Sequence, residues 1–190
     1  MLGPKLIVIS APSGSGKTTI AQQILKRHPE VLFSVSATTR LKREHEVHSK
    51  DYFFITKEEF KRKIENNELV EWEQIYEDYY GTLKSEVDRA LRSGKSMLFD
   101  VDVKGALSIR KHYPKETVII YIKPPNMAIL IERLRNRKTE TPETIRKRLE
   151  RVPMELEQET AFGFSVVNND LETAVDEVDR IISRTLNEEK

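Results

Sequence analysis

The sequence predicts a three-layer α/β fold, in which helices cover both faces of a parallel sheet. Three short apolar runs, at residues 6–9, 97–99 and 118–122, lack the polar alternation of half-exposed strands and are typical of strands buried on both faces. Each run is followed by a segment with helical periodicity. Strands that alternate with helices are joined by right-handed crossovers, so we expect these strands to lie parallel.

The elements can be placed in order along the chain. The first strand ends in a Gly/Ser-rich turn, and the helix after it ends before Pro29. Another helix opens near Asn126. The first helix is expected to span residues 17–27. The remaining expected elements are a short strand at residues 31–35, a helix at 104–111, a strand at 164–167 and a closing helix at 171–186.

Residues 36–94 interrupt this alternation. Segments 52–55 and 70–73 alternate apolar and polar residues, and Thr56 with Glu59 forms a capping box for a short helix. We expect an inserted antiparallel lobe over residues 36–94, with a core domain built from residues 1–35 and 95–190. A second irregular stretch, residues 136–142, precedes a helix with Thr141 as its N-cap and Pro142 as its first residue.

Length and composition exclude several classes of protein. The 190 residues suffice for one core with a small inserted lobe, and 32 Lys+Arg against 31 Asp+Glu leave no basic excess for nucleic acid. Without cysteine there are no disulfides, thiolate nucleophiles or thiolate metal sites. No signal-peptide pattern or apolar run of about 18 residues is present, so we expect a cytoplasmic protein with no membrane or nucleic-acid partner. The oligomeric state stays open.

The turn after the first strand is a candidate phosphate-binding loop. Backbone N–H groups at the start of a helix can surround a polyphosphate, and the helix dipole favours its negative charge. We expect Lys17 to reach the β- and γ-phosphates of ATP and the Thr18 hydroxyl to ligate Mg²⁺. The first position of the motif is Ala11, where the consensus has Gly. The ATP-binding candidates are Ala11, Pro12, Ser13, Gly14, Ser15, Gly16, Lys17, Thr18 and Thr19.

Further groups indicate a second, anionic substrate. Arg40 and Arg43 follow the second strand, and arginine forks suit bidentate contacts with phosphate. Tyr52 and Tyr80 could add phenol hydrogen bonds, although packing in the core or a turn explains either tyrosine equally well. Asp100 ends a buried strand, where open α/β sheets bind ligands, and is a candidate for holding Mg²⁺ through water. Asp102 lies on the same face of that segment. Together these groups favour a nucleoside monophosphate kinase over a GTPase or a motor ATPase.

The assembled motifs resemble the guanylate kinase family over nearly the whole chain. They occur in the family's order and spacing at residues 10–18, 36–40, 51–52, 71–72, 79–82, 100–102, 135–140 and 168–171. The resemblance implies a P-loop fold with a five-stranded parallel sheet, a GMP-binding lobe and a helical lid over about residues 126–160.

The resemblance also implies roles for particular residues. Guanine offers N1–H and an exocyclic amine as donors, which suit carboxylate acceptors. Without the resemblance, Glu71 would read as part of a solvated face of an acid-rich strand. The implied guanine contacts are Ser36, Glu71, Thr82 and Asp102, and the implied GMP phosphate contacts are Arg40, Arg43, Tyr52 and Tyr80. Arg137 and Arg148 are implied to join Lys17 and Asp100 in phosphoryl transfer, and Asn168 to lie near the adenine of ATP.

The implied reaction is transfer of the γ-phosphoryl group of ATP to GMP, and to dGMP, with Mg²⁺. Two alternatives remain: a kinase for another nucleoside monophosphate, and a non-catalytic domain that uses the same lobe to bind a protein. The presence of Lys17, Thr18 and Asp100 favours an enzyme. Two departures from the family pattern are Lys138, in place of a glycine, and the loop at residues 44–50, whose two acids and two histidines could weaken GMP binding or make it depend on pH.

Overall fold

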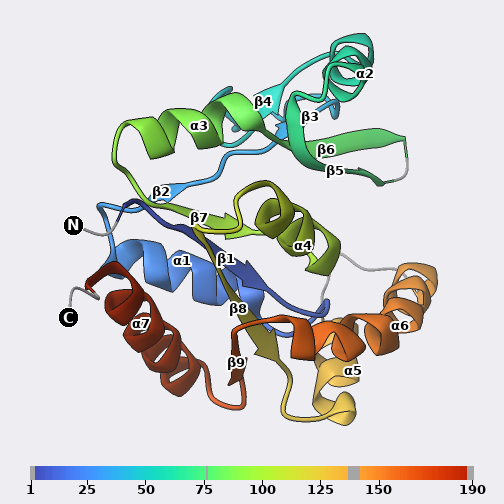
Figure 1. Ribbon diagram of the computed structural model, residues 1–190. Helices are drawn as coiled ribbons and strands as arrows, with labels where there is room; N and C mark the ends of the chain where they lie inside the picture. Colours follow the sequence, from blue (N-terminus) through green and yellow to red (C-terminus); the bar gives the residue numbers. More distant parts are fainter. Residues whose placement is uncertain (1–2, 76, 137–141, 188–190) are drawn as a thin grey trace.

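The computed structural model describes residues 3–75, 77–136 and 142–187. Its larger sheet has the strand order β2-β7-β1-β8-β9, and all neighbouring strands in it are parallel (Figure 1). This confirms the predicted five-stranded parallel sheet. Its strands are β1 (Leu6–Ser10), β2 (Leu32–Phe33), β7 (Met97–Asp100), β8 (Thr117–Lys123) and β9 (Phe164–Val167).

Two helices begin at residues that the sequence favours as caps. The Thr56 hydroxyl accepts a hydrogen bond from the Glu59 N–H, and the Asn126 side chain accepts one from the Ile129 N–H. Each of these bonds satisfies one of the free N–H groups at a helix start. The described helices are α1 (Lys17–Arg27), α2 (Lys57–Glu65), α3 (Lys84–Arg92), α4 (Val103–His112), α5 (Met127–Arg135), α6 (Pro142–Glu157) and α7 (Leu171–Asn187), with a 3-10 helix η1 (Gln158–Ala161) after α6.

Helices cover both faces of the large sheet. Side chains alternate along a strand, so Ile7 and Ile9 of β1 join an apolar cluster with α1 and α7, while Leu6 and Val8 join a second cluster with α3 and α4. Every residue of β1 is buried. The central strand is therefore buried on both faces, as its unbroken apolar run predicts.

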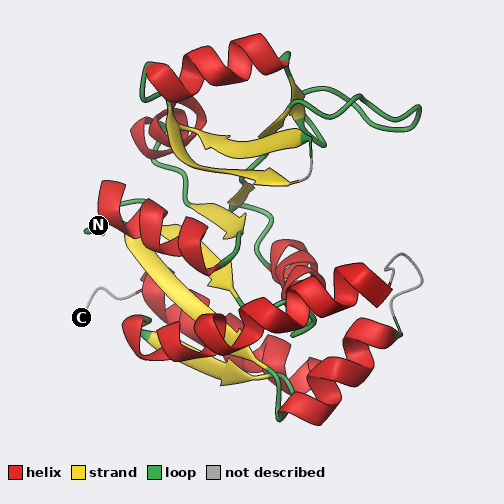
Figure 2. Cartoon of the chain, turned by 90° about the vertical axis from the view of Figure 1, so that its right-hand side faces the viewer, coloured by secondary structure: helices red, strands yellow, loops and turns green. Residues whose placement is uncertain are grey.

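The inserted lobe has its own sheet and its own small core. Its strand order is β4-β3-β6-β5, from β3 (Ala37–Thr38), β4 (Phe53–Phe54), β5 (Leu69–Ile75) and β6 (Asp78–Leu83). The pairings of β6 with β3 and β5 are antiparallel, as predicted, and the short β3–β4 pairing is parallel. Phe60 of α2 is fully buried against this sheet. Figure 2 shows the lobe as a separate layer above the large sheet.

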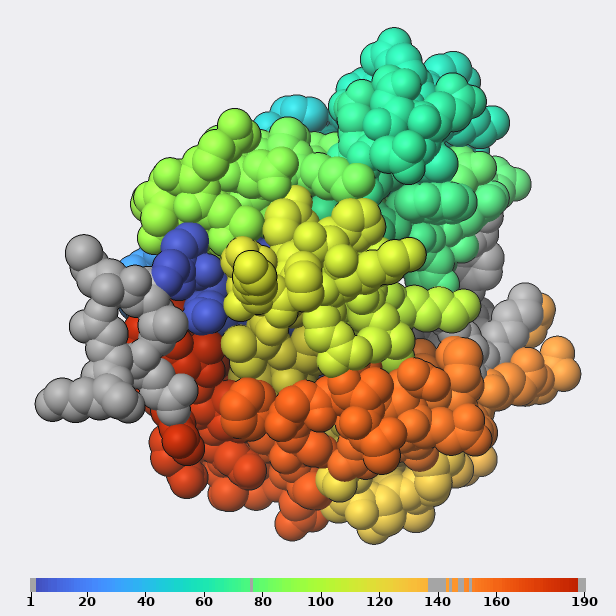
Figure 3. Space-filling view, viewed as in Figure 1, coloured from blue at the N-terminus to red at the C-terminus, as the bar shows by residue number. Residues whose placement is uncertain are grey.

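Helices α5 and α6 pack against each other at the other end of the molecule. Leu130 and Leu134 of α5 form an apolar cluster with Val152, and with Ile145 and Leu149 of α6. In Figure 3 this pair and the inserted lobe lie at opposite ends of the same face, with α4 between them. None of the described helices is long and apolar enough to cross a membrane.

The sequence-based expectation fails most clearly at β2 and at α3. The strand expected at 31–35 is only Leu32–Phe33, paired with β7 at the sheet edge. Helix α3 was not predicted as an element, because Leu83 at its N-cap makes no side-chain cap. Val87 and Ala90 of α3 are nonetheless buried in the core beside β1. The division into residues 1–35 with 95–190, and 36–94, stays a prediction.

Candidate active site

The phosphate-loop candidate forms a tight turn between β1 and α1. Gly14 and Gly16 have φ values of 93° and 88°, in the left-handed region that favours glycine. The Ser15 N–H donates to the Pro12 carbonyl over 3.1 Å. No side chain caps the start of α1. The N–H groups of its first turn are therefore available to an anion, as a polyphosphate site requires.

Ala11 fits the loop without strain. Its side chain is only 3% exposed and belongs to the apolar cluster that contains Ile7, Ile9 and Ile20. Among the described residues, the non-glycine positions with positive φ are Ser49 and Asn67, so Ala11 adopts an ordinary conformation. The departure from the glycine consensus adds a buried methyl group and leaves the turn intact.

The loop is packed from behind by α5 and by Asn168. A Cβ atom at Gly14 would lie 2.9 Å from Leu134 Cγ, and one at Gly16 would lie 2.4 Å from Asn168 Nδ2. Asn168 is buried, and its Nδ2 donates to the Ser15 carbonyl over 2.7 Å. The resemblance suggested a contact between Asn168 and adenine; the structure shows its amide bonded to the backbone of the phosphate loop.

This packing predicts that Gly16→Ala weakens ATP binding at least about tenfold, because the new methyl must displace Asn168 and the backbone must keep a positive φ. Two controls separate the causes. Gly94 has φ +70° with open space around it, so Gly94→Ala tests the effect of backbone strain without a clash. Gly163→Ala introduces neither backbone strain nor a clash. Calorimetric titration with ATP checks the result; ATP affinity as high in Gly16→Ala as in Gly163→Ala would contradict it.

Lys17 and Asp100 meet at the carboxyl edge of the sheet. Strands β1 and β7 are neighbours, with Ile9 in register with Asp100. Lys17 Nζ lies 2.6 Å from Asp100 Oδ1 and donates to the Val101 carbonyl over 2.8 Å. The structure therefore brings together two residues 83 positions apart that the sequence assigned to one site.

The oxygen donors at this point suit Mg²⁺. The exposed Thr18 lies in the first turn of α1, and the Asp100 carboxylate ends the adjacent strand. Mg²⁺ prefers oxygen ligands and takes few from the protein, since phosphate oxygens and waters complete its shell. A hydroxyl and a carboxylate beside a phosphate loop fit this preference.

A second group of side chains gathers between β5 and α4. Glu71 and Thr82 are partners in register, and the Thr82 hydroxyl donates to Glu71 Oε1 over 2.6 Å. Asp102 caps α4 by accepting from the Gly105 N–H over 2.8 Å. A Cβ atom on Gly105 would lie 3.3 Å from Asp102 Oδ1 and 3.4 Å from Glu71 Oε2. Both carboxylates thus border the same glycine.

An irregularity in β5 directs Glu71 into this site. The register between β5 and β6 shifts between Leu69 and Glu71, as at a β-bulge. Val70 then points into the core, where it is 2% exposed, and the Ser108 hydroxyl donates to its carbonyl over 2.6 Å. Bulges often redirect a side chain next to a functional site. Here Val70 anchors the strand to α4 and Glu71 faces Asp102.

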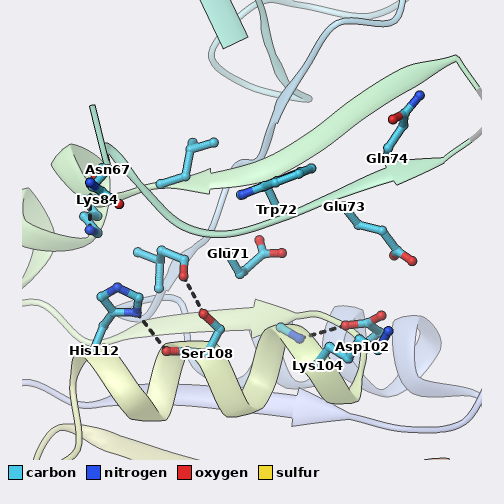
Figure 4. Close-up of a pocket in the computed structure, with 13 residues that line it drawn as sticks. Asn67, Glu71, Trp72, Glu73, Gln74, Lys84, Asp102, Lys104, Ser108 and His112 are labelled. Atoms are coloured by element: carbon cyan, nitrogen blue, oxygen red, sulfur yellow. Dashed lines mark hydrogen bonds between the residues drawn. The ribbon is translucent and has the colours of Figure 1, made fainter. Parts of the chain in front are cut away.

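The space between β5 and α4 is a groove of about 540 Å³ (Figure 4). Glu71 and Trp72 line it from β5, and Asp102, Lys104 and Ser108 line it from α4 and its start. It is large enough for a base-sized ligand. Its carboxylates favour a ligand that donates hydrogen bonds.

The pKa of Glu71 is raised to about 7, chiefly by burial and also by the neighbouring Asp102 charge, while the hydrogen bond from the Thr82 hydroxyl lowers it. Because the folded pKa lies above the ordinary 4.5, the folded state holds this proton more tightly than the unfolded state does. The resulting stabilisation is present below about pH 4.5 and is lost as the pH rises through 7.

Glu71→Gln should therefore stabilise the protein at pH 8 by about 2 kcal/mol more than at pH 5, since the amide carries no charge to bury. Urea unfolding at the two pH values measures the difference. Glu77→Gln, at an exposed acid beyond the end of β5, is the control. An equal effect of Glu71→Gln at both pH values would contradict the assigned burial of its charge.

The arginines and tyrosines expected at a phosphate lie in the inserted lobe. The Arg40 guanidinium stands 5.4 Å from the centre of the Tyr52 ring, and the Tyr52 and Tyr80 rings are 6.1 Å apart. Arg43 is exposed on the same loop. Sequence analysis treated Glu46 as a departure from the family, but the structure shows it bonded to Arg40 through both carboxylate oxygens.

The structure does not test the implied contacts of three expected site residues. Ser36 precedes β3, and its carbonyl accepts from the Phe53 N–H over 2.9 Å. Arg137, like Lys138 and the expected cap Thr141, lies outside the described residues. Helix α6 carries Arg148, whose side chain is not among those described. The roles of these arginines stay predictions.

The phosphate loop at the end of β1, facing a lobe with paired carboxylates and a basic loop, defines a P-loop nucleoside monophosphate kinase. The family model for guanylate kinase matches residues 3–185. The chain belongs to the guanylate kinase family.

Individual relatives agree with this assignment. A guanylate kinase of Chlorobium chlorochromatii is 47% identical over 94% of this chain and 94% of its own, and one of Thermotoga maritima is 47% identical over 94% of this chain and 86% of its own. The crystal structure of guanylate kinase from Anaplasma phagocytophilum has a TM-score of 0.74 at 28% identity, covering 98% of this chain and 88% of its own. A gluconokinase from Sinorhizobium meliloti, at 16% identity and a TM-score of 0.52, shares only the fold.

Proposed function

We propose that this protein transfers the γ-phosphoryl group of ATP to GMP or dGMP, giving ADP and GDP or dGDP. The observation that carries the proposal is the position of two sites at one edge of the large sheet. The phosphate loop and Asp100 end β1 and β7, and Asp102, two residues beyond Asp100, opens the groove that Glu71 lines. A donor phosphate on the loop and a purine in the groove would therefore be neighbours.

The proposed mechanism depends on how the substrates are bound and does not need a general base. The attacking oxygen of a nucleoside monophosphate is already anionic at neutral pH, so alignment and charge neutralisation can supply the catalysis. Lys17 holds the β- and γ-phosphates, and Arg137 and Arg148 approach the transferring group from the lid. Closure of the lid would exclude water that otherwise hydrolyses ATP.

Mg²⁺ would be held by the Thr18 hydroxyl and, through water, by Asp100, and when bound with ATP it neutralises charge on the β- and γ-phosphates. Ser36, Glu71, Thr82 and Asp102 bind the guanine in this proposal. Glu71 and Asp102 accept from its N1–H and amino group, and hydroxyl groups can donate to its O6. Arg40, Arg43, Tyr52 and Tyr80 bind the GMP phosphate.

The remaining parts of the proposal concern setting and partners. We place the protein in the cytoplasm, with ATP and GMP as its partners and without nucleic acid. A non-catalytic protein-binding role is disfavoured because Lys17 and Asp100, which such a role would not need, stand in contact at the phosphate loop.

The test is a product assay with ATP, GMP and Mg²⁺, with and without a chelator. We expect ADP and GDP in equal amounts, and neither product when the metal is chelated. ADP without GDP would indicate an ATPase, and a lack of both products in the presence of Mg²⁺ would indicate a binding domain. Either outcome would contradict the proposal.

A further inference from the structure

Glu46 is a buried acid at the centre of a basic loop. The residue is 7% exposed, although its neighbours in the loop are exposed. Its Oε1 accepts from Arg40 Nη2 over 2.6 Å, and its Oε2 accepts from Arg40 Nη1 over 3.0 Å and from the Arg43 N–H over 2.7 Å. Its carbonyl accepts from Lys42 Nζ over 3.0 Å. This one residue therefore contacts both arginines and the lysine of segment 40–46.

These bonds fix the direction in which Arg40 points. A guanidinium has five N–H hydrogens in a rigid plane. Nη1 donates to Glu46 and to the Leu41 carbonyl, and Nη2 donates once to Glu46. This leaves the Nε hydrogen and the second Nη2 hydrogen, which form the side edge of the group. Glu46 thus holds Arg40 from one end and does not take up its side edge.

Aromatic groups hold the same guanidinium on its face. Arg40 Cζ lies 5.4 Å from the centre of the Tyr52 ring and 5.7 Å from that of Phe54. Hydrogen bonding with Glu46, and to a smaller extent the nearby Tyr80 hydroxyl, raises the pKa of Arg40. The guanidinium therefore already lies among the phenols expected at the GMP phosphate.

We propose that Glu46 is a positioning residue for the acceptor substrate: it fixes Arg40, and the loop backbone at Arg43, so that the side edge of Arg40 meets the phosphate of GMP. This role rests on the proposed function, because it assigns the ligand of the basic loop as a nucleoside monophosphate. Glu46 itself touches no substrate in this arrangement.

A different role for the same contacts is a carboxylate stand-in, which the phosphate displaces. The observations favour positioning for two reasons. Glu46 occupies the end of the Arg40 fork and leaves its side edge, and it also bonds the Arg43 N–H, which anchors it within the loop. Hydrogen bonding from Arg40 lowers the pKa of Glu46 to about 2, so the acid stays charged at neutral pH.

The first test compares GMP with guanosine, which lacks the phosphate. In Glu46→Ala and Glu46→Gln we expect GMP binding to weaken at least about tenfold, which is the scale of one lost charge-assisted hydrogen bond. The affinity for guanosine and the KM for ATP should not change. Calorimetry, or the fluorescence of Trp72, the single tryptophan of the chain, measures the affinities. Glu44→Gln, at an exposed acid two residues away, removes the same charge and should not weaken GMP binding.

The second test is a double-mutant cycle with Arg40→Ala. If Glu46 acts through Arg40, the variant that carries Arg40→Ala and Glu46→Ala should bind GMP about as weakly as Arg40→Ala alone. Additive losses would overturn the proposal, as would equal weakening of GMP and guanosine. Tighter GMP binding in Glu46→Ala would show that the Glu46 carboxylate is displaced by the phosphate of GMP, and would also overturn the proposal. A wild-type protein that binds no GMP would contradict the proposed function itself, and this role with it.

Discussion

Lys17→Ala is expected to lower turnover by at least about a thousandfold, the scale of removing a cation that stabilises transition-state charge on a phosphoryl group. Lys17 is the first residue of α1, and its ammonium already stands between Asp100 and the Val101 carbonyl. Its side chain is 20% exposed, so the loss removes little packing. Steady-state kinetics with ATP and GMP measures the change.

The control for this loss is Lys26→Ala, which removes the same charge from an exposed position on the same helix and should leave turnover unchanged. Circular dichroism on both variants should show native helix content. Turnover of the Lys17→Ala variant within about tenfold of wild type would contradict the role of Lys17 at the phosphates.

Glu71→Gln and Asp102→Asn should each lower kcat/KM for GMP by about a hundredfold, while the KM for ATP changes little. Guanine presents donors to these carboxylates, and an amide can turn its own N–H groups toward them, which leaves a buried donor unpaired. Both variants keep the local structure, since Gln can still accept from Thr82 and Asn is as good an N-cap as Asp.

The quantity that tests this prediction is the loss in kcat/KM for GMP relative to the change in KM for ATP. Equal losses for GMP and ATP would mean that the variants disturb the fold around α4 and that these carboxylates do not read the base. The exposed control Glu77→Gln should change neither parameter. The guanine role requires a loss confined to the monophosphate.

Elements with strong local signals could be predicted from the sequence. Helix α1 spans Lys17–Arg27 and strand β9 spans Phe164–Val167, both as expected, because a glycine turn, a following proline and short apolar runs mark their ends. The phosphate loop was found for the same reason, since its residues are consecutive. Helix α3 has no capping side chain, and its amphipathic pattern alone did not separate it from the surrounding strands.

Contacts made across the fold could not be predicted in the same way. The amide of Asn168 meets Ser15 across 153 positions of the chain, and its place under the loop depends on how β9 and α7 pack. The burial of Glu71 depends on the irregular register after Leu69. From the sequence, Glu46 was one of two loop acids that could weaken GMP binding, and only the fold shows that it is enclosed by Arg40 and Arg43.

The central claim is that the groove beside Glu71 and Asp102 selects guanine as the base of the acceptor. The most direct measurement is kcat/KM with ATP for GMP, dGMP, AMP, UMP and dTMP under identical conditions. Both guanine substrates should exceed the other three by at least about a hundredfold, because adenine and the pyrimidines do not offer the same pair of donors to the two carboxylates. A preference for AMP, UMP or dTMP, or equal use of all five substrates, would contradict the claim that this groove selects guanine.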